Sequence, residues 1–272
     1  MPNPIERVRR TVWKGDSFTV AERPIPNEVA IAITYGGSTQ AVMMATPADF
    51  EDFAVGFSTT EGLIRTPKDI TSLEVIEEAE GVELRMWLVP ELAETYSRRR
   101  RLLAGPTGCG LCGIESLTEA VKAPAAVSAA GHLRPQDIVA AMAALPARQV
   151  LNEEARAIHA AGFWTPGEGL VAVREDVGRH NALDKLVGHL VRSERSAKDG
   201  LIVLTSRVSV EMVQKAAAIG APVIAAVSAP TALAVKMAEE AGITLIAIAR
   251  GDSFEVFTHA GRIGSGAASS AA

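Results

Sequence analysis

The second half of the chain alternates short apolar segments with amphipathic ones, and this alternation constrains the fold more than any other feature. Continuous apolar runs predict strands over residues 170–173, 201–204, 223–227, 243–248 and 254–257. Apolar residues at helical spacing predict helices over residues 183–191, 209–218 and 231–241, and two more helices are expected, from Pro135 and over residues 152–163. Apolar strands that alternate with helices are typical of a mostly parallel sheet covered on both faces.

The first part of the chain predicts a smaller unit. Strands are expected within residues 17–45, with a hairpin turn at Gly36 and Gly37, and over residues 73–76 and 82–88. Thr46 is expected to cap a helix that begins at Pro47, with Asp49 closing a capping box. We therefore predict an α/β protein, α+β overall. Its parts are a small N-terminal α+β domain at 1–104, a loop at 105–113, a larger domain at 114–262 and a disordered tail at 263–272.

Composition excludes some classes of function. The 272 residues carry 27 Lys and Arg against 32 Asp and Glu, a formal net charge of −5, which argues against general nucleic-acid binding. No apolar run is long enough to span a bilayer, and the N-terminus lacks the apolar core of a signal peptide. The expectation is a cytoplasmic protein that acts neither on nucleic acid nor in a membrane.

The only two cysteines, Cys109 and Cys112, lie in the glycine-rich stretch Gly-Cys-Gly-Leu-Cys-Gly over residues 108–113. Glycine gives little side-chain cover, so this stretch is expected to be a loop that presents sulfur. Four consecutive arginines at residues 98–101 lie just upstream. Nearby positive charge favours the thiolate, which is both the nucleophile and the metal ligand. The loop therefore predicts sulfur chemistry or metal binding.

Three interpretations of this loop are open. Zinc needs about four ligands, so a dimer would have to pool two such loops, because the five histidines are scattered along the chain. A thioredoxin-type dithiol usually begins a helix, whereas this loop joins two units. The third interpretation is a mobile loop that carries a group on sulfur, such as a persulfide.

Polar residues follow the predicted strands of the larger domain. They are Ser206 and Arg207, Ser228 and Thr231, and residues 249–253 with Arg250. In open α/β sheets, ligands bind beyond the carboxyl ends of the strands. Arginines gathered there in an acidic protein predict a site for an anionic small molecule, such as a nucleotide or a phosphorylated cofactor. The sequence contains neither a P-loop nor a G-x-G-x-x-G motif placed after a strand, so a nucleotide would be held in another manner.

Four segments of the chain resemble the FdhD family of formate dehydrogenase accessory proteins and sulfur carriers. They are GPTGCGLCG at residues 105–113, REDVGRHNALDK at 174–185, SRVSVEMVQK at 206–215 and SAPT at 228–231. The resemblance spans about residues 15 to 262, and the second segment is the most specific.

The resemblance implies a cytoplasmic homodimer whose larger domain is similar to the three-layer cytidine deaminase fold without its zinc. It implies a sulfurtransferase-like carrier that takes persulfide sulfur from a cysteine desulfurase. The carrier passes the sulfur to molybdenum in bis(molybdopterin guanine dinucleotide), which formate dehydrogenase requires. On this reading Cys109 carries the persulfide and Cys112 resolves or relays it, and no residue binds a structural metal.

For cofactor binding, the favoured turn comprises Ile248, Ala249, Arg250, Gly251, Asp252 and Ser253, with Ser206, Arg207, Ser228 and Thr231 beside it. Arg250 is expected to contact phosphate and Asp252 a guanine edge, so GDP should mimic part of the cofactor. Two alternatives use the same residues differently: a cofactor chaperone without sulfur transfer, and a zinc-stapled dimeric scaffold.

Overall fold

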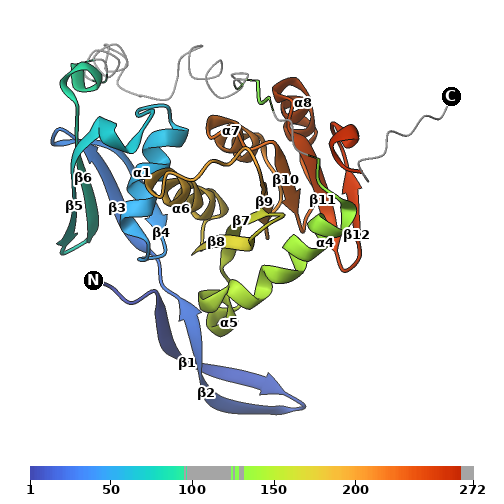
Figure 1. The fold of residues 1–272 in the computed structure, drawn as a ribbon. Helices are drawn as coiled ribbons and strands as arrows, with labels where there is room; N and C mark the ends of the chain where they lie inside the picture. The colour runs from blue at the N-terminus through green and yellow to red at the C-terminus, as the bar shows by residue number, and fades with distance from the viewer. Residues whose placement is uncertain (95, 97–123, 125, 129–131, 265–272) are drawn as a thin grey trace.

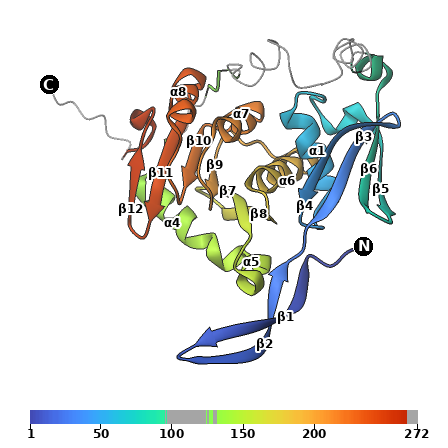
Figure 2. The ribbon, with the colours of Figure 1, turned by 180° about the vertical axis from the view of Figure 1, so that it is seen from behind.

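The computed structural model describes residues 1–94, 96, 124, 126–128 and 132–264. Within them, the strands form three sheets of two, four and six strands. Figures 1 and 2 show the two-stranded hairpin projecting from the body and the two larger sheets separated by helices. The predicted α+β class is confirmed.

The N-terminal part contains the hairpin and the four-stranded sheet. Strands β1 (Ile5–Lys14) and β2 (Ser17–Pro26) pair along their whole length. The four-stranded sheet has the order β4-β3-β6-β5 and is formed by β3 (Val29–Tyr35), β4 (Ser38–Ala45), β5 (Ile70–Glu78) and β6 (Gly81–Leu88). Helix α1 (Phe50–Thr60) packs its phenylalanines on one face of this sheet, and a short turn η1 (Pro67–Asp69) leads into β5.

The C-terminal part contains the six-stranded sheet, in the order β12-β11-β10-β9-β7-β8. Its strands are β7 (His159–Thr165), β8 (Gly169–Asp176), β9 (Leu201–Leu204), β10 (Val223–Ala226), β11 (Thr244–Arg250) and β12 (Ser253–Val256). Its helices are α4 (Pro135–Ala144), α5 (Val150–Ala155), α6 (Arg179–Arg192), α7 (Val210–Ala218) and α8 (Ala232–Ala241), with short turns η2 (Pro146–Arg148) and η3 (Ala260–Arg262).

Helices cover both faces of the six-stranded sheet. Ile138 and Ala141 of α4 pack with Val203 and Ile246 on one face. Helices α6, α7 and α8 pack on the other face against residues such as Phe163. The burial of apolar side chains on both faces explains why β9 and β10 are apolar throughout. The closer likeness to the cytidine deaminase fold stays a prediction.

Helices α1 and α6 cross closely and join the two parts of the protein. A Cβ atom on Gly56 would lie 1.7 Å from the carbonyl oxygen of Asp184, and one on Gly188 would lie 1.8 Å from the carbonyl oxygen of Asp52. Only residues without a side chain allow the two backbones to approach this far.

The expectation of a mostly parallel sheet is wrong. Among the five strand pairs of the six-stranded sheet, only β9–β10 and β10–β11 are parallel. The hairpin β7–β8 and the returning strand β12 are antiparallel to their neighbours. A turn too short for a crossover connection leads into β12, so that strand has to return antiparallel.

The helix start predicted at Thr46 is also wrong. Helix α1 begins at Phe50 after Asp49, which is left-handed and makes no side-chain cap. Thr46 is fully buried, and its hydroxyl accepts a hydrogen bond from the backbone N–H of Val177. Thr46, which the sequence pattern predicted as a local helix cap, therefore joins two segments that are distant in the chain.

The helix predicted over residues 152–163 is replaced by two elements. Helix α5 ends at Ala155, where Arg156 takes a left-handed conformation, and β7 begins at His159. Strand β7 lies between β8 and β9, so its alanines are buried on both sides. Alanine favours helices locally, and the tertiary position overrides that preference.

Three further comparisons with the sequence-based predictions concern the ends of the two parts. The charged strand β1 was not predicted, although it forms half of the projecting hairpin. The boundary at residues 105–113 lies outside the described residues and stays a prediction. Of the predicted tail, Ile263 pairs with Leu133, and residues 265–272 are outside the described part. No helix among the described residues has the length and apolar character needed to cross a membrane.

Candidate functional site

The carboxyl ends of four strands meet at one edge of the six-stranded sheet. Strand β7 is antiparallel to both β8 and β9, so β8 and β9 run in the same direction. Strands β10 and β11 continue that direction (Figure 2). The sequence-based expectation that the polar residues after these strands share one edge is therefore confirmed. We call this edge the carboxyl edge.

The segments after β9 and β10 are joined to each other. Val208 and Pro230 form a bridge, and the backbone N–H of Thr231 donates to the carbonyl of Val208 over 3.0 Å. The Thr231 hydroxyl caps α8 by accepting from the N–H of Ala234 over 3.2 Å. Ser206 is buried and donates to the carbonyl of Arg207, whose own side chain is exposed. Of these predicted residues, Arg207 presents a charge that no described residue pairs, and the Thr231 hydroxyl is used for its cap.

The turn between β11 and β12 contains the other predicted residues. Arg250 is exposed, and its Nε donates to the carbonyl of Val227 at the end of β10 over 3.0 Å. Ser253 donates to the carbonyl of Arg250, and Gly251 is left-handed with φ +60°. Asp252 is exposed at the tip. The structure thus places Arg250 beside the Ser228 segment, as a site shared by two strand ends requires.

Histidines and an arginine at the same edge were not named as candidate ligands from sequence. His159 begins β7, and its Nδ1 lies 3.4 Å from the hydroxyl of Thr205. Burial, with a smaller contribution from the positive charge of Arg179, lowers the pKa of His159. The Nε of Arg179 is buried, and no described residue forms a hydrogen bond with it.

His180 adds a second imidazole beside this group. Its Nε2 lies 2.8 Å from a carboxylate oxygen of Glu211 and 3.4 Å from the hydroxyl of Ser209. Burial lowers the pKa of His180 even though Glu211 acts in the opposite direction. A neutral His180 has a single N–H, which the Glu211 carboxylate accepts. The groups that suit an anionic ligand are therefore the Arg179 guanidinium and the neutral His159 imidazole. For Arg179 and His180, the only signal in the sequence was the REDVGRHNALDK segment.

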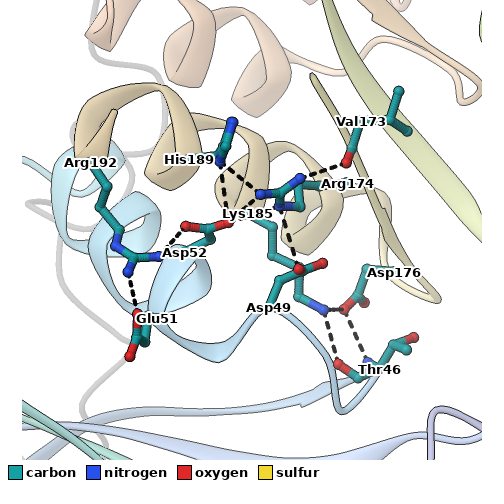
Figure 3. Close-up of polar contacts among 10 residues, drawn as sticks. All are labelled: Thr46, Asp49, Glu51, Asp52, Val173, Arg174, Asp176, Lys185, His189 and Arg192. Atoms are coloured by element: carbon teal, nitrogen blue, oxygen red, sulfur yellow. Dashed lines mark hydrogen bonds and ion pairs between the residues drawn. The ribbon is translucent and has the colours of Figure 1, made fainter. Parts of the chain in front are cut away.

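A buried ion pair holds the turn that carries Arg179 and His180 (Figure 3). The Lys185 Nζ lies 2.7 Å from Asp176 Oδ2, and neither side chain is exposed to solvent. Lys185 also donates to the carbonyl of Thr46, whose N–H donates to Asp176. The other Asp176 oxygen accepts from the N–H of Gly178 and from Asn181. These hydrogen bonds compensate the buried charges of Lys185 and Asp176, and they hold the start of α6 in place.

A second polar group in Figure 3 ties α6 to α1. The buried Asp52 carboxylate contacts Arg174 at 2.7 Å and Arg192 at 2.5 Å, and Arg192 also pairs with Glu51. His189 lies 2.7 Å from Arg174, and burial lowers the pKa of its imidazole. These contacts join the two parts of the protein and lie on the side of α6 away from its first turn. They are a structural feature rather than part of the candidate site.

Cys109 and Cys112 lie outside the described residues, as do the arginines at residues 98–101. Their assignment as sulfur carriers stays a prediction. The site that the structure describes is therefore the carboxyl edge, where cationic and neutral donor groups gather.

Known proteins share most of this chain. The model of the FdhD/NarQ family matches residues 26–264. A protein of Agrobacterium fabrum named sulfur carrier protein FdhD is 54% identical over 94% of this chain and 95% of its own. The protein of the same name from Brucella abortus is 50% identical over 94% of this chain and 96% of its own. The chain belongs to the FdhD/NarQ family.

The fold is also shared with a solved structure. A crystal structure from Desulfotalea psychrophila, described as a formate dehydrogenase accessory protein, superimposes with a TM-score of 0.73. It covers 95% of this chain and 99% of its own at 24% sequence identity. The shared fold therefore includes both parts described above. The family model and the relatives confirm the family resemblance predicted from the REDVGRHNALDK segment.

Proposed function

We propose that this protein is a sulfur carrier that takes persulfide sulfur from a cysteine desulfurase and passes it to molybdenum in bis(molybdopterin guanine dinucleotide), for a formate dehydrogenase. The observation that carries the proposal is the similarity, 54% and 50% identity over 94% of the chain, to relatives that are named sulfur carrier proteins. A cytoplasmic location is part of the proposal.

Loading of the carrier needs no further reagent. The Cys109 thiolate attacks the outer sulfur of the donor's persulfide, the donor's S–S bond breaks, and the donor thiol is released. The product is a persulfide on Cys109, and Cys112 is the partner thiol that resolves or relays it.

The carboxyl edge fits the nucleotide portion of such a cargo. The exposed Arg250 has no carboxylate partner among the described residues, and the buried Nε of Arg179 also lacks a hydrogen bond there. The His159 imidazole, whose pKa is lowered by burial, adds a neutral donor. These groups suit phosphate and would bind and orient the cargo, while Asp252 can accept hydrogen bonds from a guanine edge.

We expect GDP to bind better than ADP. Guanine has an N1–H and an exocyclic amine, and the Asp252 carboxylate can accept a hydrogen bond from each. Adenine does not offer this pair of donors. Arg250→Ala should weaken both nucleotides by about tenfold, since charge-assisted hydrogen bonds contribute roughly 1.5–3 kcal/mol. Asp252→Ala should narrow the gap between them, whereas Glu255→Ala, an exposed acid of β12, should leave it unchanged. Calorimetry measures each affinity, and equal binding of GDP and ADP by the unaltered protein would remove the guanine assignment.

The homodimer in this proposal is supported by the projecting hairpin. At its tip, Trp13 and Phe18 lie on one face with ring centroids 4.8 Å apart, and they are 56% and 72% exposed. Val20 lies on the same face and is also exposed. A two-stranded ribbon is marginally stable alone, and exposed aromatic clusters mark protein contacts. We assign this face to contact with a second copy.

Phe18→Glu should therefore shift the protein from about twice the chain mass of 28.6 kDa toward one chain. A charge on the contacting face has to be desolvated in the dimer, which weakens association. Thr19→Glu is the matched control, because Thr19 is exposed on the opposite face of the same strand. Light scattering coupled to chromatography gives the mass, and a Phe18→Glu protein that stays dimeric would place the interface elsewhere.

A further inference from the structure

The four-stranded sheet is covered by a helix on one face only. Ile31 and Ile33 of β3 and Leu84 of β6 are fully buried and belong to the same core as Phe53 of α1. Successive side chains of a strand point to opposite faces, so the residues between these lie on the other face of the sheet. Figure 1 shows the helices on the side of the six-stranded sheet, with no described helix or strand on the opposite side. We call this uncovered side the outer face.

The outer face carries apolar side chains where a solvated sheet face normally carries polar ones. Val42 and Met44 of β4 are 62% and 51% exposed, and Trp87 of β6 is 47% exposed. Val42 lies opposite Ala32 and Met44 lies opposite Ala30, so β3 and β4 form a continuous apolar strip. Exposed apolar patches with a polar rim mark sites of interaction with another molecule.

Carboxylates lie beside this strip on the same face. Glu83 of β6 lies opposite Ala32, which places it on the outer face. Glu74 lies opposite Arg85, and Glu78 is four residues further along β5, so both share that face, and both are exposed. Arg85 forms its ion pair with Glu83 at 2.5 Å. Three carboxylates against one guanidinium leave the outer face with a net negative charge.

The surrounding sequence is acidic as well. Residues 27–94, which contain the four-stranded sheet and α1, hold 13 Asp and Glu against three Lys and Arg, a net charge of −10. The whole chain has a net charge of −5, so the negative charge is concentrated in this part. An acidic surface repels an anionic cofactor or a nucleic acid and attracts a basic partner. The outer face therefore suits a protein that presents Lys and Arg around an apolar patch.

We propose that the outer face docks the sulfur donor of this carrier, which meets it with a basic surface. The inference rests on the proposed function, since it names the surface used by one of its two protein partners. The other partner, the formate dehydrogenase, has to receive the cargo at the carboxyl edge, which belongs to the six-stranded sheet on the far side of α1 and α6 (Figure 1). Docking of the donor on the outer face leaves that edge open, so the carrier takes up sulfur while it holds its cargo.

The test measures binding of a cysteine desulfurase to the full chain by calorimetry. We expect the double variant Glu74→Lys with Glu78→Lys to bind at least about tenfold more weakly, because like charges then meet across the interface. Trp87→Ala should also weaken binding by about tenfold, since it removes an apolar anchor without changing the charge. Glu153→Lys with Glu154→Lys is the matched control. It reverses two exposed acids of α5, gives the same net charge as the double variant, and should bind within about twofold of the unaltered protein.

The rate of sulfur loading separates docking from a role in the chemistry. The double variant should need about tenfold more desulfurase for half-maximal loading, yet reach the rate of the unaltered protein when the desulfurase is saturating, because Cys109 is unchanged. Its unfolding temperature and its affinity for GDP should not change, since Glu74 and Glu78 are exposed. A rate that stays low at saturating desulfurase would show that these residues serve the chemistry or the fold, and would overturn the proposal.

Three other results would also overturn it. If the desulfurase binds the double variant and the unaltered protein equally well, the outer face is not its docking surface, while the proposed function stands. If the double variant instead loses binding to a formate dehydrogenase, or changes from two chains to one by light scattering, the outer face belongs to the client enzyme or to a second copy. If the desulfurase neither binds nor loads the unaltered protein, the sulfur-transfer function fails and the docking surface fails with it.

Discussion

Gly188→Ala is expected to destabilise the protein by at least about 3 kcal/mol, toward the upper end of what overpacking costs. The added methyl group would lie 1.8 Å from the Asp52 carbonyl oxygen and 2.8 Å from the backbone nitrogen of Gly56. Neither atom belongs to a flexible side chain, so α1 and α6 have to separate. The buried contacts of Asp52 with Arg174 and Arg192 would be strained with them.

The sign of this effect is what makes it informative. In a helix with room for the methyl group, replacing glycine by alanine stabilises by roughly 1 kcal/mol. Gly167→Ala is the control, because a Cβ atom there has no other atom within 4 Å and the residue has no positive φ. Thermal and urea unfolding compare the three proteins, and a Gly188→Ala protein as stable as the control would mean that the helices do not cross as closely as described.

Sequence reasoning predicted most elements of the six-stranded sheet because burial on both faces makes its strands continuously apolar. Strand β9 was predicted at its observed bounds for this reason. Sequence reasoning failed for β7, because the alanines and glycine of this segment carry no local strand signal. The segment is a strand because β8 and β9 flank it. The sequence also did not predict the direction of each strand, because both β11 and the antiparallel β12 contain apolar residues and give the same strand signal.

The candidate site was predicted in part. The edge that gathers Ser228 and Arg250 follows from strand order, and the structure brings these segments together. The buried pair of Lys185 and Asp176 could not be predicted from the sequence, because charged residues usually lie at the surface. The pair also depends on a hydrogen bond to the backbone of Thr46, which is far away in the chain. His159 was not named as a candidate because it lay within the segment predicted to be a helix, residues 152–163.

Cys109→Ala should abolish activation of a co-expressed formate dehydrogenase, to the level seen without the protein. If the Cys109 thiolate is the nucleophile that carries sulfur, alanine cannot replace it, and the chain has only one other cysteine, Cys112. The variant should fold and bind GDP as the unaltered protein does, because the predicted nucleotide site uses Arg250 and Asp252. Cys112→Ala is the matched control, and it should reduce activation while still accepting sulfur on Cys109.

This variant separates the sulfur carrier from the cofactor chaperone. A chaperone needs the nucleotide site and not the thiol, so it would predict full activation by Cys109→Ala and loss of activation by Arg250→Ala. Full activation by both cysteine variants together would therefore refute the sulfur-transfer account and leave the nucleotide site in place.

The most direct measurement is the intact mass of the protein after incubation with a cysteine desulfurase and cysteine, without added reductant. The account predicts an adduct of about 32 Da, one sulfur atom, on the unaltered protein and on Cys112→Ala. It predicts no adduct on Cys109→Ala, and removal of the adduct by a thiol reductant. An unaltered protein that gains no sulfur, or a Cys109→Ala protein that gains as much, would contradict the claim that Cys109 carries the persulfide.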